Sequence, residues 1–172
     1  GDINYVGGVF YMTEESDADN PFTLGFGTLN NFYGVESESI AAYAHADYNV
    51  NEKLRITAGL RYTTEEKTLY IERPDDFSFA FFFPLARTTA NDTWNNTTAM
   101  ISLNYEIADN IQTYGKISQG WKAGGFNGEA PNAELAVKPY DAEKVLAYEL
   151  GVKSRWLDQR LQANVAAFYN DV

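Results

Sequence analysis

Apolar and polar residues alternate along several stretches of this chain, and that alternation is what most constrains its fold. Between Leu54 and Tyr62 every second residue is apolar, and the positions between them include Arg55 and Arg61. Side chains of a β-strand point alternately to its two faces, so such a segment has one apolar and one polar face. The same pattern predicts strands at residues 40–48, 99–105 and 161–169, and weaker alternation adds residues 3–14 and 111–122.

A seventh segment, residues 145–156, fits two structures by its period. As a strand it places Leu150 and its alternate neighbours on one face and Glu149 and the basic residues on the other. As a helix it has an apolar stripe at spacings of three and four, with Asp141 as a suitable N-cap. Gly151 in the middle disfavours the helix. The period alone leaves both structures open.

Short and long connections alternate along the chain. The short ones have the composition of tight turns and lie at residues 49–53, 108–110 and 158–159. The long ones are residues 16–35, 73–92 and 123–142. Such asymmetry is typical of outer-membrane barrels, whose periplasmic turns are short. An aromatic residue precedes each short turn (Tyr48, Tyr105 and Trp156), where a girdle at the membrane interface is expected.

The polar face of these strands carries charges that a packed core cannot hold without partners. They are Arg55, Arg61, Glu106, Glu149, Lys153 and Arg155. Such charges can line a wet or plugged lumen, while an apolar face of about nine to eleven residues matches the membrane thickness for a tilted strand. The sequence therefore predicts an all-β fold, an antiparallel transmembrane β-barrel meander. Barrels need at least eight strands, so we expect seven to be part of a larger, incomplete barrel that continues beyond both ends.

The composition excludes several other functions. The chain has 172 residues and a formal net charge of -11, which argues against a nucleic-acid partner. It has no cysteine and one histidine, His45, so it offers no thiolate or histidine-pair metal site. No convergent nucleophile, base or metal set is present. We expect no enzyme activity, no cofactor and no metal.

Several segments resemble the TonB-dependent outer-membrane receptors. The resemblance lies in residues 51–62, 114–127, 139–154 and 156–171, and it favours the strand for residues 145–156. It implies a 22-stranded barrel in the bacterial outer membrane, closed by an N-terminal plug domain. It also implies uptake of scarce nutrients, most often ferric siderophores, energised by the TonB complex. The expected partners are outer-membrane lipid, the plug of the same protein, the TonB complex and the siderophore. We expect residues 1–172 to be a partial barrel domain without the plug and the C-terminal closing strand.

Aromatic residues in the long loops are the candidate ligand contacts. Phe79 and Phe81 lie in the phenylalanine-rich segment 77–84, and Trp121 lies at the loop side of the signature segment. Stacking on such rings would hold a planar or apolar ligand. Alternation of the phenylalanines also fits a strand that continues above the membrane and packs on neighbouring loops, and this interpretation is favoured. It extends to the first loop, with Phe22, Phe26, Phe32 and Tyr33.

Charged residues are more simply structural. Adjacent carboxylates occur at Glu14–Glu15, Glu65–Glu66 and Asp75–Asp76. Neighbours on a strand point to opposite faces, so we expect the two glutamate pairs to diverge. His45 falls on the lumen side, where we expect it to be hydrogen-bonded to a wall neighbour or to the plug.

Two other classes of protein remain possible from the sequence. One is a passive or structural barrel such as a porin. The other is a soluble carbohydrate-binding β-sandwich, which would bring Leu60, Ile101 and Leu103 together in a dry centre.

Overall fold

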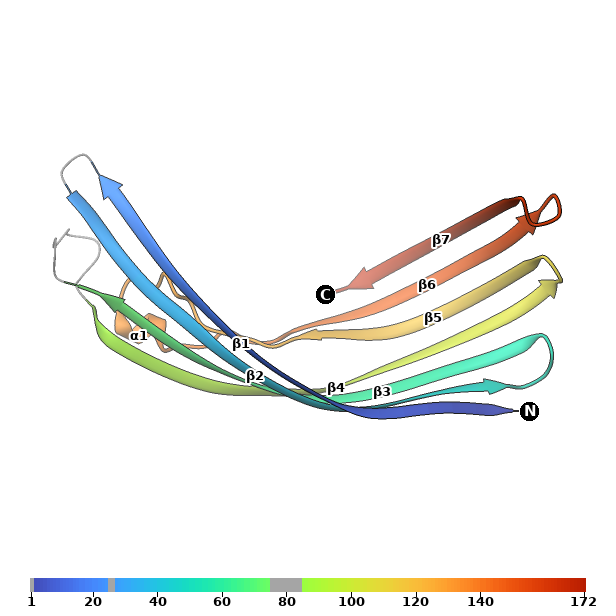
Figure 1. The fold of residues 1–172 in the computed structure, drawn as a ribbon, viewed down its shortest axis with the longest axis horizontal. Coiled ribbons are helices and arrows are strands. Elements are labelled where there is room, and N and C mark those ends of the chain that lie inside the picture. The colour runs from blue at the N-terminus through green and yellow to red at the C-terminus, as the bar shows by residue number, and fades with distance from the viewer. Residues whose placement is uncertain (1, 25–26, 75–84) are drawn as a thin grey trace.

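The computed structural model describes residues 2–24, 27–74 and 85–172, and within them it is one curved antiparallel sheet (Figure 1). Each strand pairs with the next one along the chain, in the order β1-β2-β3-β4-β5-β6-β7. This confirms the predicted meander of seven strands. The strands are β1 (Ile3–Leu24), β2 (Gly27–Asn49), β3 (Leu54–Arg73), β4 (Leu85–Ala108), β5 (Ile111–Lys122), β6 (Glu143–Trp156) and β7 (Leu161–Asp171).

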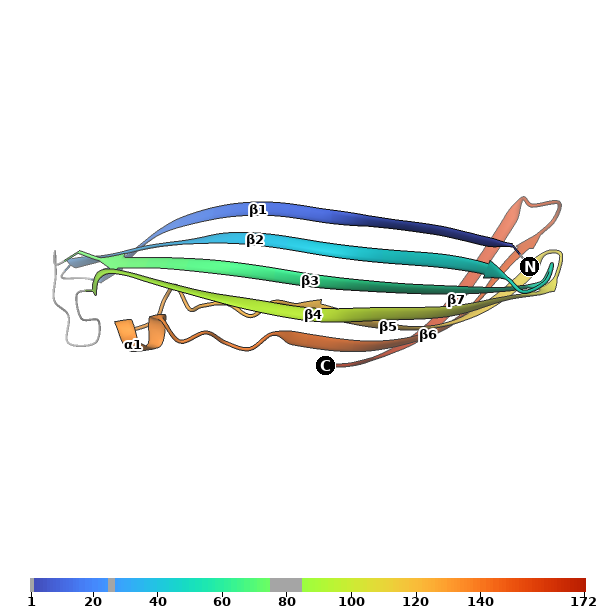
Figure 2. The same ribbon diagram turned by 90° about the horizontal axis from the view of Figure 1, so that it is seen from below.

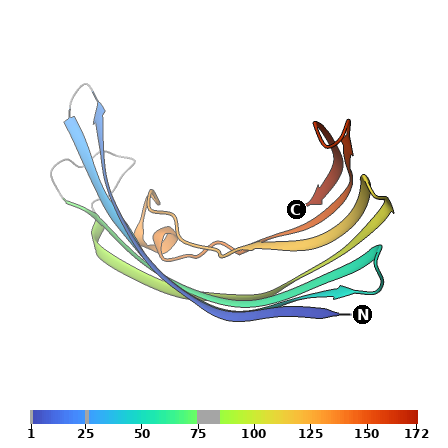
Figure 3. The same ribbon diagram turned by 45° about the vertical axis from the view of Figure 1, so that its right-hand side comes forward.

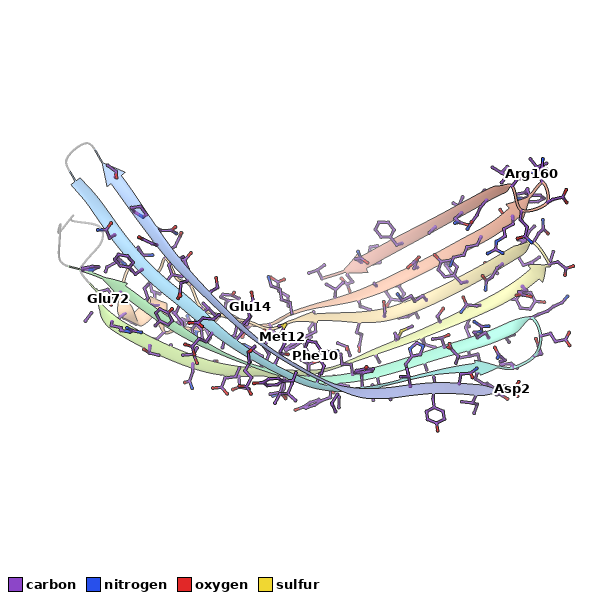
Figure 4. All side chains as sticks on the ribbon, viewed as in Figure 1. Asp2, Phe10, Met12, Glu14, Glu72 and Arg160 are labelled. Carbon is purple, nitrogen blue, oxygen red and sulfur yellow. The ribbon has the colours of Figure 1, made fainter. Side chains whose placement is uncertain are left out.

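Short turns lie at one end of the sheet and longer links at the other. The short turns join β2 to β3, β4 to β5 and β6 to β7. Asp2 and Arg160 mark this end in Figure 4, and Glu72 marks the opposite end. At the side of the longer links, strands β1 to β4 extend well beyond Glu143, the first residue of β6. The edge of the sheet on this side is therefore stepped (Figure 2).

The sheet is a single layer. Figure 3 shows it as a trough, with the β5–β6 link and the short helix α1 (Ala133–Ala136) on its concave side. Residues 145–156 lie in β6, which confirms the strand and excludes the alternative helix with Asp141 as its N-cap. The short helix α1 is a separate element of the β5–β6 link, and its N-cap is Asn132. Within the described ranges, no helix is long and apolar enough to cross a membrane.

The predicted apolar face is solvent-exposed in the sheet. The side chains of Leu60, Ile101 and Leu103 are 56%, 47% and 50% exposed, and Leu150 and Val165 are exposed further. A soluble sandwich would bury these residues against a second sheet, and the described part of the chain contains none. We call this apolar surface the outer belt and the opposite surface the inner face.

The aromatic residues that precede the short turns belong to the outer belt. Tyr48, Tyr105 and Trp156 share its strand parity and are all exposed at the short-turn end. Aromatic rings with a polar edge favour the boundary between lipid and water. Their positions agree with a girdle at that boundary.

Two of the predicted long links are wrong. Residues 16–35 are mostly strand, because β1 runs to Leu24 and β2 begins at Gly27. The second link is confined to residues 74–84, because β3 runs to Arg73 and β4 begins at Leu85. Only the third link, residues 123–142, is a long connection as expected.

The physical reason is an inversion of the apolar face along the strands. In the lower part of β3 the outward residues are apolar, ending with Tyr62, whereas further along the inward residues Leu69 and Ile71 are fully buried. The outward positions there become polar, with Glu66 and Glu72. A search for one continuous apolar parity therefore ends where the inversion begins.

The β6–β7 turn carries unusual backbone conformations. Leu157, Asp158 and Gln159 have φ of 54°, 54° and 70°, the left-handed region that disfavours residues other than glycine. We expect Gln159→Gly to stabilise the folded protein by about 1 kcal/mol, because that strain is relieved. Glu52→Gly, in the β2–β3 turn where φ is negative, is the control and should not stabilise. The melting temperature of the detergent-solubilised full-length protein measures both, and equal shifts would contradict the explanation.

Candidate functional site: the inner face and its docked loop

The inner face along β5 and β6 holds a connected group of polar side chains. The Tyr114 hydroxyl donates a hydrogen bond to Oε1 of Glu149, and Lys153 Nζ lies 5.2 Å from the centre of the Tyr114 ring. Gly151 lies opposite Tyr114 in the register, and a Cβ there would collide with the ring. The glycine that disfavours a helix thus makes room for an inward tyrosine.

A second group lies on β1, β2 and β3. The Arg61 guanidinium lies 4.9 Å from the centre of the Phe10 ring, a cation–π geometry. Phe10, Met12 and Glu14 are alternate residues of β1 (Figure 4), so they share one face of this strand. The predicted inward direction of Arg61 is therefore supported by its contact.

Asp47 of β2 is a carboxylate on the inner face, and both Thr57 and His45 lie next to it. Thr57 Oγ1 donates a 2.5 Å hydrogen bond to Asp47 Oδ1. His45 Nε2 lies 3.9 Å from the same oxygen, close enough for an ion pair when protonated but too far for a hydrogen bond. Asp47 is therefore a wall neighbour of His45, but the expected hydrogen bond between them is not formed, and a further role for His45 stays a prediction.

At the long-strand end, the link 123–142, here called the β5–β6 loop, packs on the inner face. Its buried residues Ala130 and Ala136 join a hydrophobic cluster with Leu69, Ile71 and Leu85 of the strands. Around this cluster pack Tyr33, Val35, Phe126 and Ala133. Trp94 of β4 meets Phe126 edge to face, with ring centres 5.9 Å apart. Figure 3 shows the loop against the concave side of the sheet.

Arg73 and Asn31 fasten this loop through its backbone carbonyls. The Arg73 side chain donates from Nε to Asn31 Oδ1 (3.0 Å), from Nη1 to the Pro131 carbonyl (3.1 Å) and from Nη2 to the Ala130 carbonyl. Asn31 Nδ2 donates to the Gly128 carbonyl at 3.0 Å. Arg73 is only 2% exposed. Burial lowers its pKa from the usual value, but an arginine still remains protonated.

Two further side chains, one on β3 and one on β1, contact the loop. Lys67 Nζ donates to the Gly124 carbonyl at 3.0 Å and lies 3.2 Å from Glu65 Oε1. Asn20 of β1 donates to Oε1 of Glu129 at 3.1 Å. The loop is therefore held from β1, β2 and β3, although it lies about a hundred residues away from β1 along the chain.

Glycines of the loop permit its close approach. A Cβ at Gly124 would collide with the Tyr140 carbonyl, and one at Gly128 would collide with the Tyr33 ring. Gly125 and Tyr140 exchange backbone hydrogen bonds of 3.3 and 2.8 Å. Close packing of the loop therefore requires residues without a side chain at Gly124 and Gly128.

The candidate ligand residues are only partly placed. Phe79 and Phe81 lie outside the described residues. Trp121 is near the end of β5 with the strand parity of Ile117, which places it on the outer belt side. It is half-buried, and its Nε1 is buried without a hydrogen-bond partner among the residues that the structure describes. Ligand contact by these three residues stays a prediction.

The adjacent glutamates diverge as expected, since Glu14 and Glu65 share the inner parity while Glu15 and Glu66 share the outer one. What sequence reasoning missed are cross-strand pairs, Glu15 opposite Glu36 and Glu38 opposite Glu66. Only the strand register, and no local motif, would have found them. No group of acidic or histidine side chains in the described ranges is arranged to hold a metal ion.

Comparison with known proteins identifies the family to which this chain belongs. The family model "TonB dependent receptor-like, beta-barrel" matches residues 1–172. The chain belongs to the TonB-dependent receptor family. This confirms the resemblance in the signature segments, and it places the chain in a bacterial outer-membrane protein. Proteins of this family are transporters and not enzymes, so the expectation of no enzyme activity is confirmed as well.

Curated relatives agree. The pesticin receptor of Yersinia enterocolitica serotype O:8 is 31% identical over 134 residues, 77% of this chain and 18% of the relative. The pesticin receptor of Yersinia pestis is 30% identical over the same length and shares. This TonB-dependent receptor chain thus spans about a fifth of the length of the relatives it matches.

Solved structures show the same fold. The ferric yersiniabactin uptake receptor FyuA from Yersinia pestis superposes with a TM-score of 0.84 at 21% identity, covering 99% of this chain and 26% of that one. The ferric-catecholate import receptor Fiu from E. coli K12, in its closed form, gives a TM-score of 0.76 at 15% identity, covering 98% and 28%. The predicted fold class, part of a larger transmembrane barrel, is confirmed.

Proposed function

We propose that this chain is part of an outer-membrane receptor that takes up ferric siderophores and is energised through the TonB complex. In this proposal residues 1–172 are a partial barrel domain. The rest of the receptor supplies the remaining strands, the plug domain and the segment that contacts TonB.

The observation that carries the proposal is the sequence relationship to the pesticin receptors, which extends over 77% of the chain. Three solved structures with this fold are named a ferric yersiniabactin uptake receptor (FyuA), a ferric-catecholate import receptor (Fiu) and an alcaligin outer-membrane receptor (FauA). Ligands are commonly held by concave surfaces with a few polar groups, and the inner face is such a surface. We propose Phe79, Phe81 and Trp121 as aromatic contacts of the ligand; Trp121 shares the strand parity of the outer belt, so its contact would be made at the loop end of β5 and not on the inner face.

The test is uptake by the full-length receptor. We expect its gene, placed in a strain that lacks its own siderophore receptors, to restore radioactive iron uptake from at least one ferric siderophore in a panel of catecholates, phenolates and hydroxamates. Uptake should be lost when TonB is deleted, because a closed barrel has no other source of energy.

The control is the same strain with the empty vector. Uptake that persists without TonB would indicate a passive, porin-like barrel instead. No uptake of any siderophore, with growth restored by cobalamin or a glycan, would replace the ligand class but leave the transporter proposal intact.

A further inference from the structure

The β5–β6 loop is long, yet it is packed and hydrogen-bonded as tightly as a structural element. Its buried alanines share one hydrophobic cluster with Leu69 and Ile71, the most buried large side chains described in the sheet. Three backbone carbonyls of one short stretch, residues 128–131, accept hydrogen bonds from Arg73 and Asn31. A loop free to swing would leave such carbonyls to water.

We propose that Arg73 is a positioning residue that latches the β5–β6 loop to the inner face, which makes the loop a fixed wall of the extracellular mouth and not a moving lid. The proposal concerns the position of the loop, and it holds whichever ligand the receptor takes.

The geometry requires an arginine. The guanidinium is planar with five N–H donors, and three of its nitrogens here reach three acceptors that lie on two separate segments of the chain. A lysine offers one nitrogen and cannot reach all three. Asn31 completes the arrangement, because its oxygen accepts from Arg73 while its nitrogen holds Gly128. The two side chains therefore act as one unit across β2 and β3.

The contacts of Arg73 and Asn31 with the loop determine where the exposed side chains of the loop lie on the concave side of the sheet. Leu135, Val137 and Tyr140 are exposed on the docked loop, 46%, 40% and 52% respectively. With the latch closed, these apolar groups have a fixed position on the concave side. With the latch open, they would sample many positions and the buried alanines would meet water.

Hydrogen exchange of the full-length receptor in detergent, without ligand, tests the latch directly. The amides of Ala130, Ala136 and Val137 donate within the loop at 3.2, 3.0 and 3.1 Å, so a peptide that covers residues 127–137 should be protected in the wild type. In Arg73→Gln we expect its exchange to be about tenfold faster, equivalent to about 1.4 kcal/mol of opening free energy. Arg73→Lys should give an intermediate rate.

Arg87→Gln is the matched control. Arg87 is also an arginine of the extended strands, but it lies over the outward Tyr70 ring, 5.1 Å from its centre, and should leave loop exchange unchanged. Peptides from the lower parts of β2 and β3 report whether Arg73→Gln folds, and if it does not, Asn31→Ala gives the same test. Unprotected loop amides in the wild type, or equal exchange in Arg73→Gln and Arg87→Gln, would overturn the proposal.

Discussion

Leu60→Arg is expected to destabilise the folded barrel by about 2 to 4 kcal/mol, because it places a charge in the middle of the outer belt. Leu60 is 56% exposed in the sheet and has apolar outward neighbours on the adjacent strands, Ala44 and Ala99. In the membrane these groups face acyl chains that cannot solvate a guanidinium. The midpoint of guanidinium unfolding of the receptor in phospholipid vesicles measures the loss.

Leu161→Arg is the matched control for depth. Leu161 pairs with Trp156 beside the short β6–β7 turn and is also outward and exposed, so the same substitution lies near the membrane boundary. There we expect a loss of only about 0 to 1 kcal/mol, because the guanidinium can reach water. Equal losses at Leu60 and Leu161 would show that the outer belt does not cross a hydrocarbon layer.

Gly124→Ala is expected to destabilise the receptor by about 1 to 3 kcal/mol, since one methyl group has no space there. The added Cβ would collide with the backbone carbonyl of Tyr140 and with the indole of Trp94, and a backbone neighbour cannot rotate away. We expect the bridge between Gly125 and Tyr140 to open and the β5–β6 loop to lift. The melting temperature of the solubilised receptor measures the effect.

Gly120→Ala, in the same signature segment, is the control. A Cβ at Gly120 would lie 3.6 Å from the Val145 Cβ, an ordinary contact, and its φ is not in the left-handed region. We therefore expect no destabilisation, or a slight gain from the stiffer unfolded chain. If both alanines lower the melting temperature equally, the close approach of the loop is not what requires glycine at position 124.

The lower half of the sheet could be predicted from the sequence because its alternation keeps one phase. Leu54 to Tyr62 has an apolar residue at every second position, and the structure exposes that parity on the outer belt. The upper half could not be found in this way. Leu69 and Ile71 are apolar on the opposite parity, because there the inner face is dry and the outer face is wet.

The docking of the β5–β6 loop on the inner face could not be predicted from the sequence, for a different reason. Arg73 and Pro131 are 58 positions apart, and nothing local to either residue indicates the partner. Their contact depends on the lengths of β3 and β5 and on the curvature of the sheet between them. The glycines at 124 and 125 were a visible signal, but a pattern of glycines gives no information about which surface approaches them.

The inversion of the apolar face also sets the depth at which the sheet lies in the membrane. On β2 the continuous run of outward apolar residues ends at Ile40 and is followed by Glu38; on β3 the corresponding positions are Thr64, directly opposite Ile40, and Glu66, opposite Glu38. If the sheet moved toward the cell, these glutamates would enter the hydrocarbon layer without partners. If it moved away from the cell, the apolar residues of the outer belt would be exposed to water. The boundary between apolar and polar outward residues therefore lies at the same height on β2 and β3, and this boundary opposes displacement of the sheet along the membrane normal.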